Sequence, residues 1–298
     1  MAKPKGGSLA QLDYMAPASV DEAVKALAAN AAAKVLAGGT DLIVQMKAGR
    51  AKPGVVLDLK RIPGAIGVRR EADGSFVIGA ATPGAAIGED AALGQAWPGV
   101  VEAANLIGST QVQGRASLGG NLCNASPAAD SVPALIAARA VCVIVGPAGR
   151  REAPVETIQA GPGRTSLQPG EFVLELHLPP RPARSSDAYL RLIPRTEMDI
   201  AVVGAGVNLT LDADGRIAEA HVALGAVAPT SLLVPEAGAV LVGGTLDNAA
   251  LERLDAAARA ACRPISDKRG TAEYRTQIAG VLARRAAKIA YDRAQARG

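Results

Sequence analysis

Two Gly-Gly pairs, far apart in the chain, constrain the fold more than any other sequence feature. The first lies in the segment 35–42 (VLAGGTDL) and the second in the segment 117–121 (SLGGN). Glycine tolerates a positive φ and has no Cβ atom, so another backbone or a ligand can approach it closely. A lone Gly-Gly turn often only changes the direction of the chain. Two such turns, each between strand-like and helix-like sequence, could instead close on the two phosphates of one dinucleotide.

The residues after the first pair favour a phosphate site. Thr40 or Asp41 can cap the N-terminus of a following helix. The first N–H groups of a helix have no partner within the helix, and together with the helix dipole they attract anions. We therefore expect the backbone at this turn to be available to a phosphate.

Strand-like and helix-like stretches alternate over residues 19–59. Ser19 and Glu22 have the spacing of a capping box, which predicts a helix that runs to about Ala32. A short strand over 34–37, a helix over 41–48 that stops at Gly49, and a buried strand over 55–59 should follow. This alternation predicts an α/β module.

The segment 74–178 continues with strands and helices. We expect strands over 74–80, 141–145 and 171–178, and helices that begin at Thr82-Pro83, span 100–106 and run from Ser131 to Ala140. Ser131 is a natural N-cap, with Pro133 just inside the helix. Residues 121–127 show no periodicity and are predicted to form a loop.

Repeated prolines at 179–182 mark the clearest domain boundary, because proline cannot donate a hydrogen bond to a β-ladder. Beyond them, strands over 200–211 and 218–226 should pair through a hairpin turn at 212–215. Helices are expected over 249–261 and 271–291. The C-terminal third is therefore predicted to be α+β, with a small antiparallel sheet.

Several classes of enzyme lack their motifs here. The sequence has no P-loop and no G-x-S-x-G elbow. Gly204-Ala205-Gly206 lacks the third glycine of a dinucleotide fingerprint and sits inside a predicted strand, where small residues usually mean close packing. His177 and His221 also fall in strands, without clustered metal ligands. We therefore predict no catalytic residue and no metal site, as expected where a cofactor carries the reaction.

Composition limits the location and the partners. Three cysteines are too few for the four ligands of a typical iron–sulfur cluster. No apolar run reaches the roughly 18 residues of a membrane span. Residues 1–10 lack the apolar core of a signal peptide and are predicted to be a disordered lead-in. We therefore expect a cytoplasmic protein. In the basic C-terminal segment the basic residues alternate with an apolar helical pattern, which favours a solvated helix face or an acidic partner chain over nucleic acid.

The motifs of this sequence resemble those of a known protein family. The two glycine motifs, Ala37–Leu42 and Ser117–Asn121, closely resemble those of the FAD-binding subunit, or medium chain, of molybdenum hydroxylases of the xanthine dehydrogenase and aerobic carbon monoxide dehydrogenase types. The resemblance continues, in the same order along the chain, at Tyr14 and Pro17, Ile78–Thr82, Ile107-Gly108, Ser126–Asp130, Arg195, Asp199–Ala201, Asp267–Arg269 and Tyr274-Arg275.

This resemblance implies a fold and a set of domains. Two α/β subdomains, at about 11–60 and 61–180, would form an FAD-binding domain of the PCMH type over residues 11–180. A C-terminal α+β domain, with a small antiparallel sheet plus helices, would occupy residues 184–298.

The resemblance also implies the residues that contact FAD. The turn 36–42 would wrap the diphosphate with backbone N–H groups, and the turn 117–121 would do so from the other side. Asn124 and Asp130 would bond ribityl or ribose hydroxyls, Ile107 and Val173 would line the flavin or adenine cavity, and Arg191 stands where relatives can have a lysine near the isoalloxazine. The full set is Leu36, Ala37, Gly38, Gly39, Thr40, Asp41, Leu42, Ile107, Ser117, Leu118, Gly119, Gly120, Asn121, Asn124, Asp130, Val173 and Arg191.

The function implied by the resemblance is electron transfer within a heteromeric complex. A large molybdopterin subunit would oxidise the substrate, a small subunit would carry [2Fe–2S] clusters, and FAD on this chain would pass electrons to an external acceptor. A dimer of heterotrimers, without nucleic acid or membrane span, is expected. A stand-alone FAD-dependent oxidase and a non-catalytic scaffold subunit stay open as alternatives. The substrate and the electron acceptor stay open too. Met198 stands where some relatives have an acidic residue, so the resemblance does not predict the electron acceptor.

Overall fold

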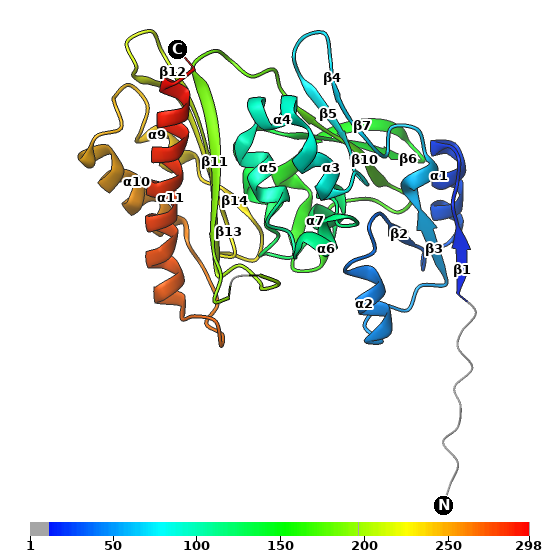
Figure 1. Ribbon diagram of the computed structural model, residues 1–298. Helices are drawn as coiled ribbons and strands as arrows, with labels where there is room; N and C mark the ends of the chain where they lie inside the picture. Colours follow the sequence, from blue (N-terminus) through cyan, green and yellow to red (C-terminus); the bar gives the residue numbers. More distant parts are fainter. Residues whose placement is uncertain (1–11, 196, 298) are drawn as a thin grey trace, which may run out of the picture.

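The computed structural model describes residues 12–195 and 197–297, and it arranges them as sheets with helices between and beside them (Figure 1). The predicted lead-in, residues 1–10, lies outside the described residues. The strands are β1 (Asp13–Met15), β2 (Lys34–Leu36), β3 (Val55–Asp58), β4 (Val68–Arg70), β5 (Phe76–Gly79), β6 (Val141–Gly146), β7 (Gly149–Pro154), β8 (Gln159–Gly161), β9 (Arg164–Thr165), β10 (Phe172–Leu178), β11 (Ser185–Leu192), β12 (Val203–Leu211), β13 (Ile217–Gly225) and β14 (Leu232–Leu233). The helices are α1 (Val20–Ala29), α2 (Leu42–Lys47), α3 (Gly84–Glu89), α4 (Ala91–Ala96), α5 (Pro98–Ala104), α6 (Thr110–Gln113), α7 (Leu118–Cys123), α8 (Ser131–Ala137), α9 (Pro235–Ala239), α10 (Asn248–Ala261) and α11 (Ala272–Gln295), with 3-10 turns η1 (Leu59–Arg61) and η2 (Val155–Thr157).

The N-terminal module is a three-stranded parallel sheet in the order β1-β3-β2. Helix α1 connects β1 to β2, as a parallel connection requires, and its buried Ala23 and Leu27 share a hydrophobic cluster with Leu57 of β3. The Ser19 half of the predicted capping box is confirmed, because Ser19 Oγ accepts from the Glu22 N–H. The Glu22 carboxylate accepts from the N–H of Ala18, one residue before the position that the motif predicts.

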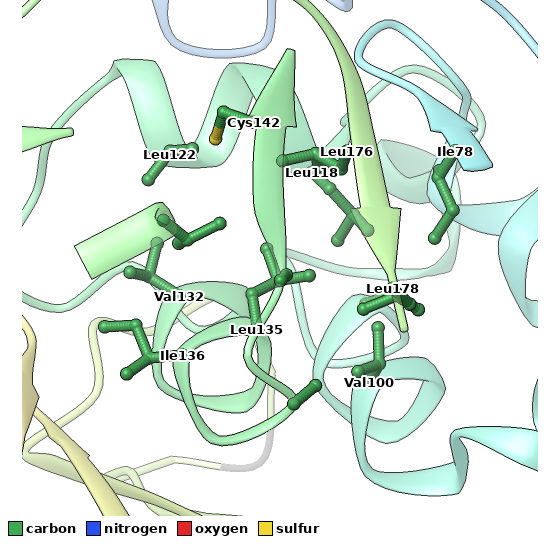
Figure 2. Close-up of a cluster of buried hydrophobic side chains, with 14 of the residues drawn as sticks. Ile78, Val100, Leu118, Leu122, Val132, Leu135, Ile136, Cys142, Leu176 and Leu178 are labelled. Atoms are coloured by element: carbon green, nitrogen blue, oxygen red, sulfur yellow. The ribbon is translucent and has the colours of Figure 1, made fainter. Parts of the chain in front are cut away.

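The second module is a five-stranded antiparallel sheet in the order β4-β5-β10-β6-β7. Helices α5, α7 and α8 contribute to the core beside it. Figure 2 shows Leu118 and Leu122 of α7 in this core with Leu135 of α8, Ile78 of β5 and Leu176 of β10; all five side chains are fully buried. Burial of one face of the sheet under helices fixes the position of α7, which begins at the second Gly-Gly motif.

The C-terminal module is a four-stranded antiparallel sheet in the order β11-β12-β13-β14. Helix α11 packs on one face, and α5 and α8 pack on the other. The small residues of β12 make this possible: a Cβ on Gly206 would lie 2.6 Å from the carbonyl oxygen of Pro133 in α8. The prediction that Gly204-Ala205-Gly206 serves close packing is confirmed.

Helix α11 packs against the sheet through small side chains. Its inward face is built from alanines that are completely buried. These are Ala279, Ala283, Ala286, Ala287, Ala290 and Ala294. Small side chains let the helix axis approach the sheet closely, so the packing is dense without aromatic residues.

Three local predictions were wrong. Residues 121–127 are not all loop, because α7 continues to Cys123; the two glycines at its start hide the helical period. Helix α5 begins at Pro98 rather than Val100, with proline in the first turn. Ser131 is not the N-cap of α8: Asp130 holds that position without a side-chain bond, while the N–H and Oγ of Ser131 donate to Asn121 Oδ1 at 3.2 and 2.7 Å.

Strand β7 was missed because its sequence, GRREAP, is exposed and charged and carries no alternation of apolar residues. It is an edge strand, where charge is ordinary. Among the described residues, no helix is both long and apolar enough to cross a bilayer.

Candidate functional site

The two Gly-Gly motifs lie against each other in the folded chain. A Cβ on Gly38 would stand 1.8 Å from the carbonyl oxygen of Arg115, just before the second motif. A Cβ on Gly120 would stand 3.8 Å from the Cβ of Ala37. The distance at Gly38 leaves no room for a side chain, whereas the distance at Gly120 is an ordinary van der Waals contact. In the second turn it is Gly119 that has no room, because its Cβ would lie 2.6 Å from the Cβ of Ala80. The two bends therefore form one structure, at the ends of β2 and at the start of α7.

The first turn leaves a run of backbone N–H groups without acceptors. From Gly38 to Leu42 no N–H donates to any described residue, whereas the N–H groups of Ile43 and Gln45 bond the carbonyls of Gly39 and Asp41. Gly39 has φ +77°, a left-handed conformation that glycine adopts without strain. Asp41 stands at the N-cap of α2 but makes no side-chain capping bond, contrary to one of the two predicted options. Such a run of free donors at a helix start is suited to an anion.

The second turn works differently from the first. Three of its N–H groups already have partners: Gly119 donates to the Ala80 carbonyl at 3.1 Å, Gly120 to Ser117 Oγ at 3.1 Å, and Asn121 to the Ser117 carbonyl at 2.9 Å. These three groups are engaged in this conformation, and donation from the second turn to a ligand stays a prediction. What the second turn offers is a surface without side chains, close to the first turn.

Both turns border one open cleft. Its space, with the open mouth included, is about 1160 Å³. Of the predicted cofactor residues, the cleft is lined by Leu36, Ala37, Gly38, Gly39, Thr40, Asp41, Leu42, Ile107, Ser117, Gly119, Gly120, Asn121, Asn124 and Val173. The cleft thus gathers polar backbone at one part and apolar walls, among them Ile107 and Val173, at another. This is the ordinary composition of a small-molecule site.

A buried carboxylate outside the predicted set anchors the first turn. Asp58, at the end of β3, accepts from Tyr14 Oη at 2.6 Å and from Lys60 Nζ at 2.7 Å, and Lys60 Nζ also donates to the Ala37 carbonyl at 2.9 Å. Burial by itself would raise the pKa of Asp58, but the bonds from Lys60 and Tyr14 outweigh it and hold the pKa below its usual value. An acidic residue inside the otherwise apolar stretch 55–59 was the signal for this anchor.

Gln45 and Cys123 are among the lining residues that were not predicted. Gln45 Nε2 donates to Asn124 Oδ1 at 2.9 Å, which ties α2 to the end of α7 across the cleft. Gln45 is the only neutral polar residue of the helix LIVQMK, and that isolated polar position could have indicated a role. Cys123 also lines the cleft, and burial raises the pKa of its thiol to about 12, so it is not a reactive thiolate.

Three predicted cofactor residues do not line the cleft. The Leu118 side chain is fully buried in the core. Asp130 and Arg191 bond each other instead, with Arg191 Nη1 at 2.7 Å from Asp130 Oδ2, and Tyr189 Oη lies 3.3 Å from the other carboxylate oxygen. Burial raises the pKa of Asp130, although the charge of Arg191 and its hydrogen bond act in the opposite direction.

The two histidines have ordinary partners. His177 Nε2 lies 3.3 Å from Glu175, and His221 Nε2 lies 2.8 Å from Glu219. Within residues 12–195 and 197–297, no three or more histidine, cysteine or acidic side chains are grouped so as to hold a metal ion.

Two family models match successive parts of the chain. Residues 10–181 match the family model described as the FAD binding domain in molybdopterin dehydrogenase, and residues 188–290 match the CO dehydrogenase flavoprotein C-terminal domain. The carbon monoxide dehydrogenase medium chain of Afipia carboxidovorans is 38% identical over 95% of this chain and 98% of its own length. The xanthine dehydrogenase FAD-binding subunit of Escherichia coli O157:H7 is 30% identical over 89% of this chain and 91% of its own. The solved structure of reconstituted CO dehydrogenase from Oligotropha carboxidovorans superposes with a TM-score of 0.89 at 36% identity, over 98% of this chain and 99% of that one.

Proposed function

The chain belongs to the family of FAD-binding medium subunits of molybdenum hydroxylases, and from this premise we propose that the cleft between its Gly-Gly turns binds the diphosphate of FAD. The observation that carries the proposal is the run of N–H groups from Gly38 to Leu42 that donate to no described residue. A diphosphate supplies the acceptors that these donors lack.

The other lining residues suit the rest of the cofactor. The side-chain-free surface at Gly119 and Gly120 allows a close approach, and Asn124 offers an amide to a hydroxyl. Ile107 and Val173 offer apolar contact to a flat ring. We assign Leu118, Asp130 and Arg191 supporting roles, because the first lies in the core and the other two are joined in a buried ion pair.

The bound flavin would supply the redox chemistry, accepting electrons and releasing them to an external acceptor. The chain itself would orient the cofactor and exclude water from part of it. Electrons would arrive from [2Fe–2S] clusters on a small partner subunit, and a large subunit would hold the molybdopterin centre. We propose a dimer of such heterotrimers in the cytoplasm.

The test uses the complex purified with its partner chains. We expect the visible spectrum of a flavin and about one FAD per medium chain. After mild removal of FAD, ADP should compete with FAD for rebinding, because it carries the same diphosphate, and adenosine should not. Riboflavin, which has no phosphate, should rebind much more weakly than FAD.

The competition separates two kinds of failure. A complex that contains no flavin and does not take up added FAD would contradict the proposed function. A complex that binds FAD but is equally inhibited by ADP and adenosine would contradict the assignment of the diphosphate to the first turn.

A further inference from the structure

Lys60 places a positive charge directly behind the first Gly-Gly turn. Its Nζ donates to the Ala37 carbonyl oxygen at 2.9 Å and to Asp58 Oδ1 at 2.7 Å. The Lys60 side chain is only 28% exposed, so these two bonds hold its ammonium group in a partly buried place. Ala37 immediately precedes Gly38, the first of the residues whose N–H groups donate to no described residue. The lysine therefore lies one peptide group away from the donors proposed for the diphosphate.

The local sequence fixes the position of this lysine. Strands β2 and β3 are parallel neighbours with Leu36 opposite Asp58, so the chain leaves both strands at the same edge (Figure 1). Asp58 then caps the turn η1, because its Oδ1 accepts from the backbone N–H of Lys60 at 3.0 Å. The same oxygen accepts from Lys60 Nζ, which brings the side chain back toward the end of β2. Tyr14 Oη donates to the other carboxylate oxygen, so Asp58 is held from both sides.

The lysine acts on the Gly38 N–H through a shared peptide group. The Ala37 carbonyl and the Gly38 N–H belong to one planar amide, and no peptide bond within the described residues is cis, so the two groups point in opposite directions. A cation at the carbonyl oxygen draws electron density away from the nitrogen and makes its N–H a stronger donor. The ion pair with Asp58 is oriented to keep this effect, since its positive end is the one that contacts the carbonyl.

The cleft has little other positive charge to offer a diphosphate. Among the described residues that line it, Lys34 is the only cation, and its side chain is exposed. Two lining residues, Asp41 and Glu171, are acidic, and Glu171 is paired with Arg151. An anion in this cleft therefore depends mainly on backbone N–H groups, and their strength as donors matters more than it would in a site lined by arginines.

We propose that Lys60 is a positioning residue of the cofactor site, which holds the first turn and polarises the peptide between Ala37 and Gly38 so that the Gly38 N–H binds the diphosphate of FAD more strongly. The inference rests on the proposed function. The charge of Lys60 does not touch the cofactor, and it acts only through a donor to phosphate. Ligands that carry the diphosphate should therefore depend on Lys60, and ligands without phosphate should not.

The first experiment measures the affinities of FAD, ADP and riboflavin in the FAD-depleted complex of the medium chain with its partner chains. Lys60→Met, which keeps an apolar stem without a charge, should weaken FAD and ADP by about 10-fold each and change the affinity for riboflavin by less than about 2-fold. Lys47→Met is the matched control, because Lys47 carries the same charge in the last turn of α2 but is exposed. It should bind all three ligands as the wild type does. Equal losses for FAD and riboflavin in Lys60→Met, or an unchanged affinity for ADP, would overturn the proposal.

The second experiment separates the charge of Lys60 from its hydrogen bond. Lys60→Arg keeps a cationic donor and should hold the ADP affinity within about 3-fold of the wild type, whereas Lys60→Gln offers only a neutral donor and should not. A lysine that only braced the turn would be replaced equally well by both, so full rescue by Lys60→Gln would overturn the polarising role. If the wild-type complex takes up no FAD, the proposed function itself fails; if it binds FAD and Lys60→Met binds FAD equally well, only the role of Lys60 fails.

Discussion

The carbonyl oxygen of Arg115 occupies the space where a side chain on Gly38 would begin. The separation from an ideal Cβ would be 1.8 Å, far less than any contact that atoms tolerate. The first Gly-Gly turn is therefore held against the backbone that leads into the second turn. The cleft exists because two segments nearly eighty residues apart in sequence meet without side chains between them.

Gly38→Ala should separate the two turns. The added methyl group has to push backbone rather than a flexible side chain, and overpacking of this kind costs about 1–3 kcal/mol. Because the same shift moves the free N–H groups of the turn, the affinity for FAD should fall by at least about 10-fold, measured by titration of the FAD-depleted complex. Gly94→Ala is the control, since a Cβ there meets no atom within 4 Å in the middle of α4. It should bind FAD normally and be neutral or slightly stabilising. Equal FAD affinity in both variants would contradict the close contact.

Ser117→Ala tests whether the start of α7 depends on its cap. Ser117 Oγ accepts from the Gly120 N–H at 3.1 Å, and loss of such a cap costs about 0.5–2 kcal/mol. Ser109→Ala is the matched control, because Ser109 holds the N-cap position of α6 without making a side-chain capping bond. Urea unfolding of the complex should show a lower midpoint for the first variant and a smaller change for the second. A larger loss in Ser109→Ala would show that the cap is not the source of stability.

Asp58 should make the first module sensitive to acid. The pKa of Asp58 is lowered in the folded chain, so the folded state binds this proton less readily than the unfolded state. The resulting stability is present above the ordinary aspartate pKa of about 3.9 and is lost as pH falls through the lower folded value. The stability difference between wild type and Asp58→Asn should therefore be largest near neutral pH and shrink below about pH 4. Thermal unfolding across this pH range measures it, with the exposed Asp13→Asn as control; a difference that grows on acidification would refute the anchor.

Much of the fold was predictable from the sequence because capping and alternation are local signals. Ser19 and Glu22 predicted the start of α1, and the turn at 212–215 predicted the β12–β13 hairpin. Helix α7 could not be predicted in the same way. Its two glycines lower helix propensity, and what holds it is tertiary: the buried Leu118 and Leu122 and the contact with Ala80.

Part of the site was also predictable from local sequence signals. The glycine motifs indicated both turns, but which turn has free N–H groups depends on contacts made elsewhere. The N–H of Gly119 is satisfied by Ala80, almost forty residues earlier, and no local pattern indicates that bond. Asp130 and Arg191 were expected at the cofactor, yet the antiparallel pairing of β11 with β12 brings Arg191 to the start of α8, where the two charges meet.

Variants of Arg191 and Asp130 test whether these residues form a structural ion pair or contact the cofactor. Removal of one member of a buried pair leaves the other charge uncompensated and costs about 3–5 kcal/mol. Arg191→Met should therefore destabilise the chain strongly, and the second change Asp130→Asn should restore much of the loss. Arg195→Met is the control, because its pair with Asp199 is exposed at the arginine, and such pairs contribute about 0–1 kcal/mol.

The deficit of Arg191→Met should shrink on acidification, as that of Asp58→Asn does, but for a different reason. Burial raises the pKa of Asp130 even beside Arg191, and without the arginine only the hydrogen bond from Tyr189 opposes that effect. The lone carboxylate penalises folding only while it is ionised, so the deficit of Arg191→Met should be greatest at neutral pH and should shrink as Asp130 takes up a proton on acidification. Unfolding midpoints and FAD titrations of the same samples distinguish the roles. If Arg191→Met left stability unchanged and lowered only the affinity for FAD, the arginine would be a direct cofactor ligand rather than a partner of Asp130.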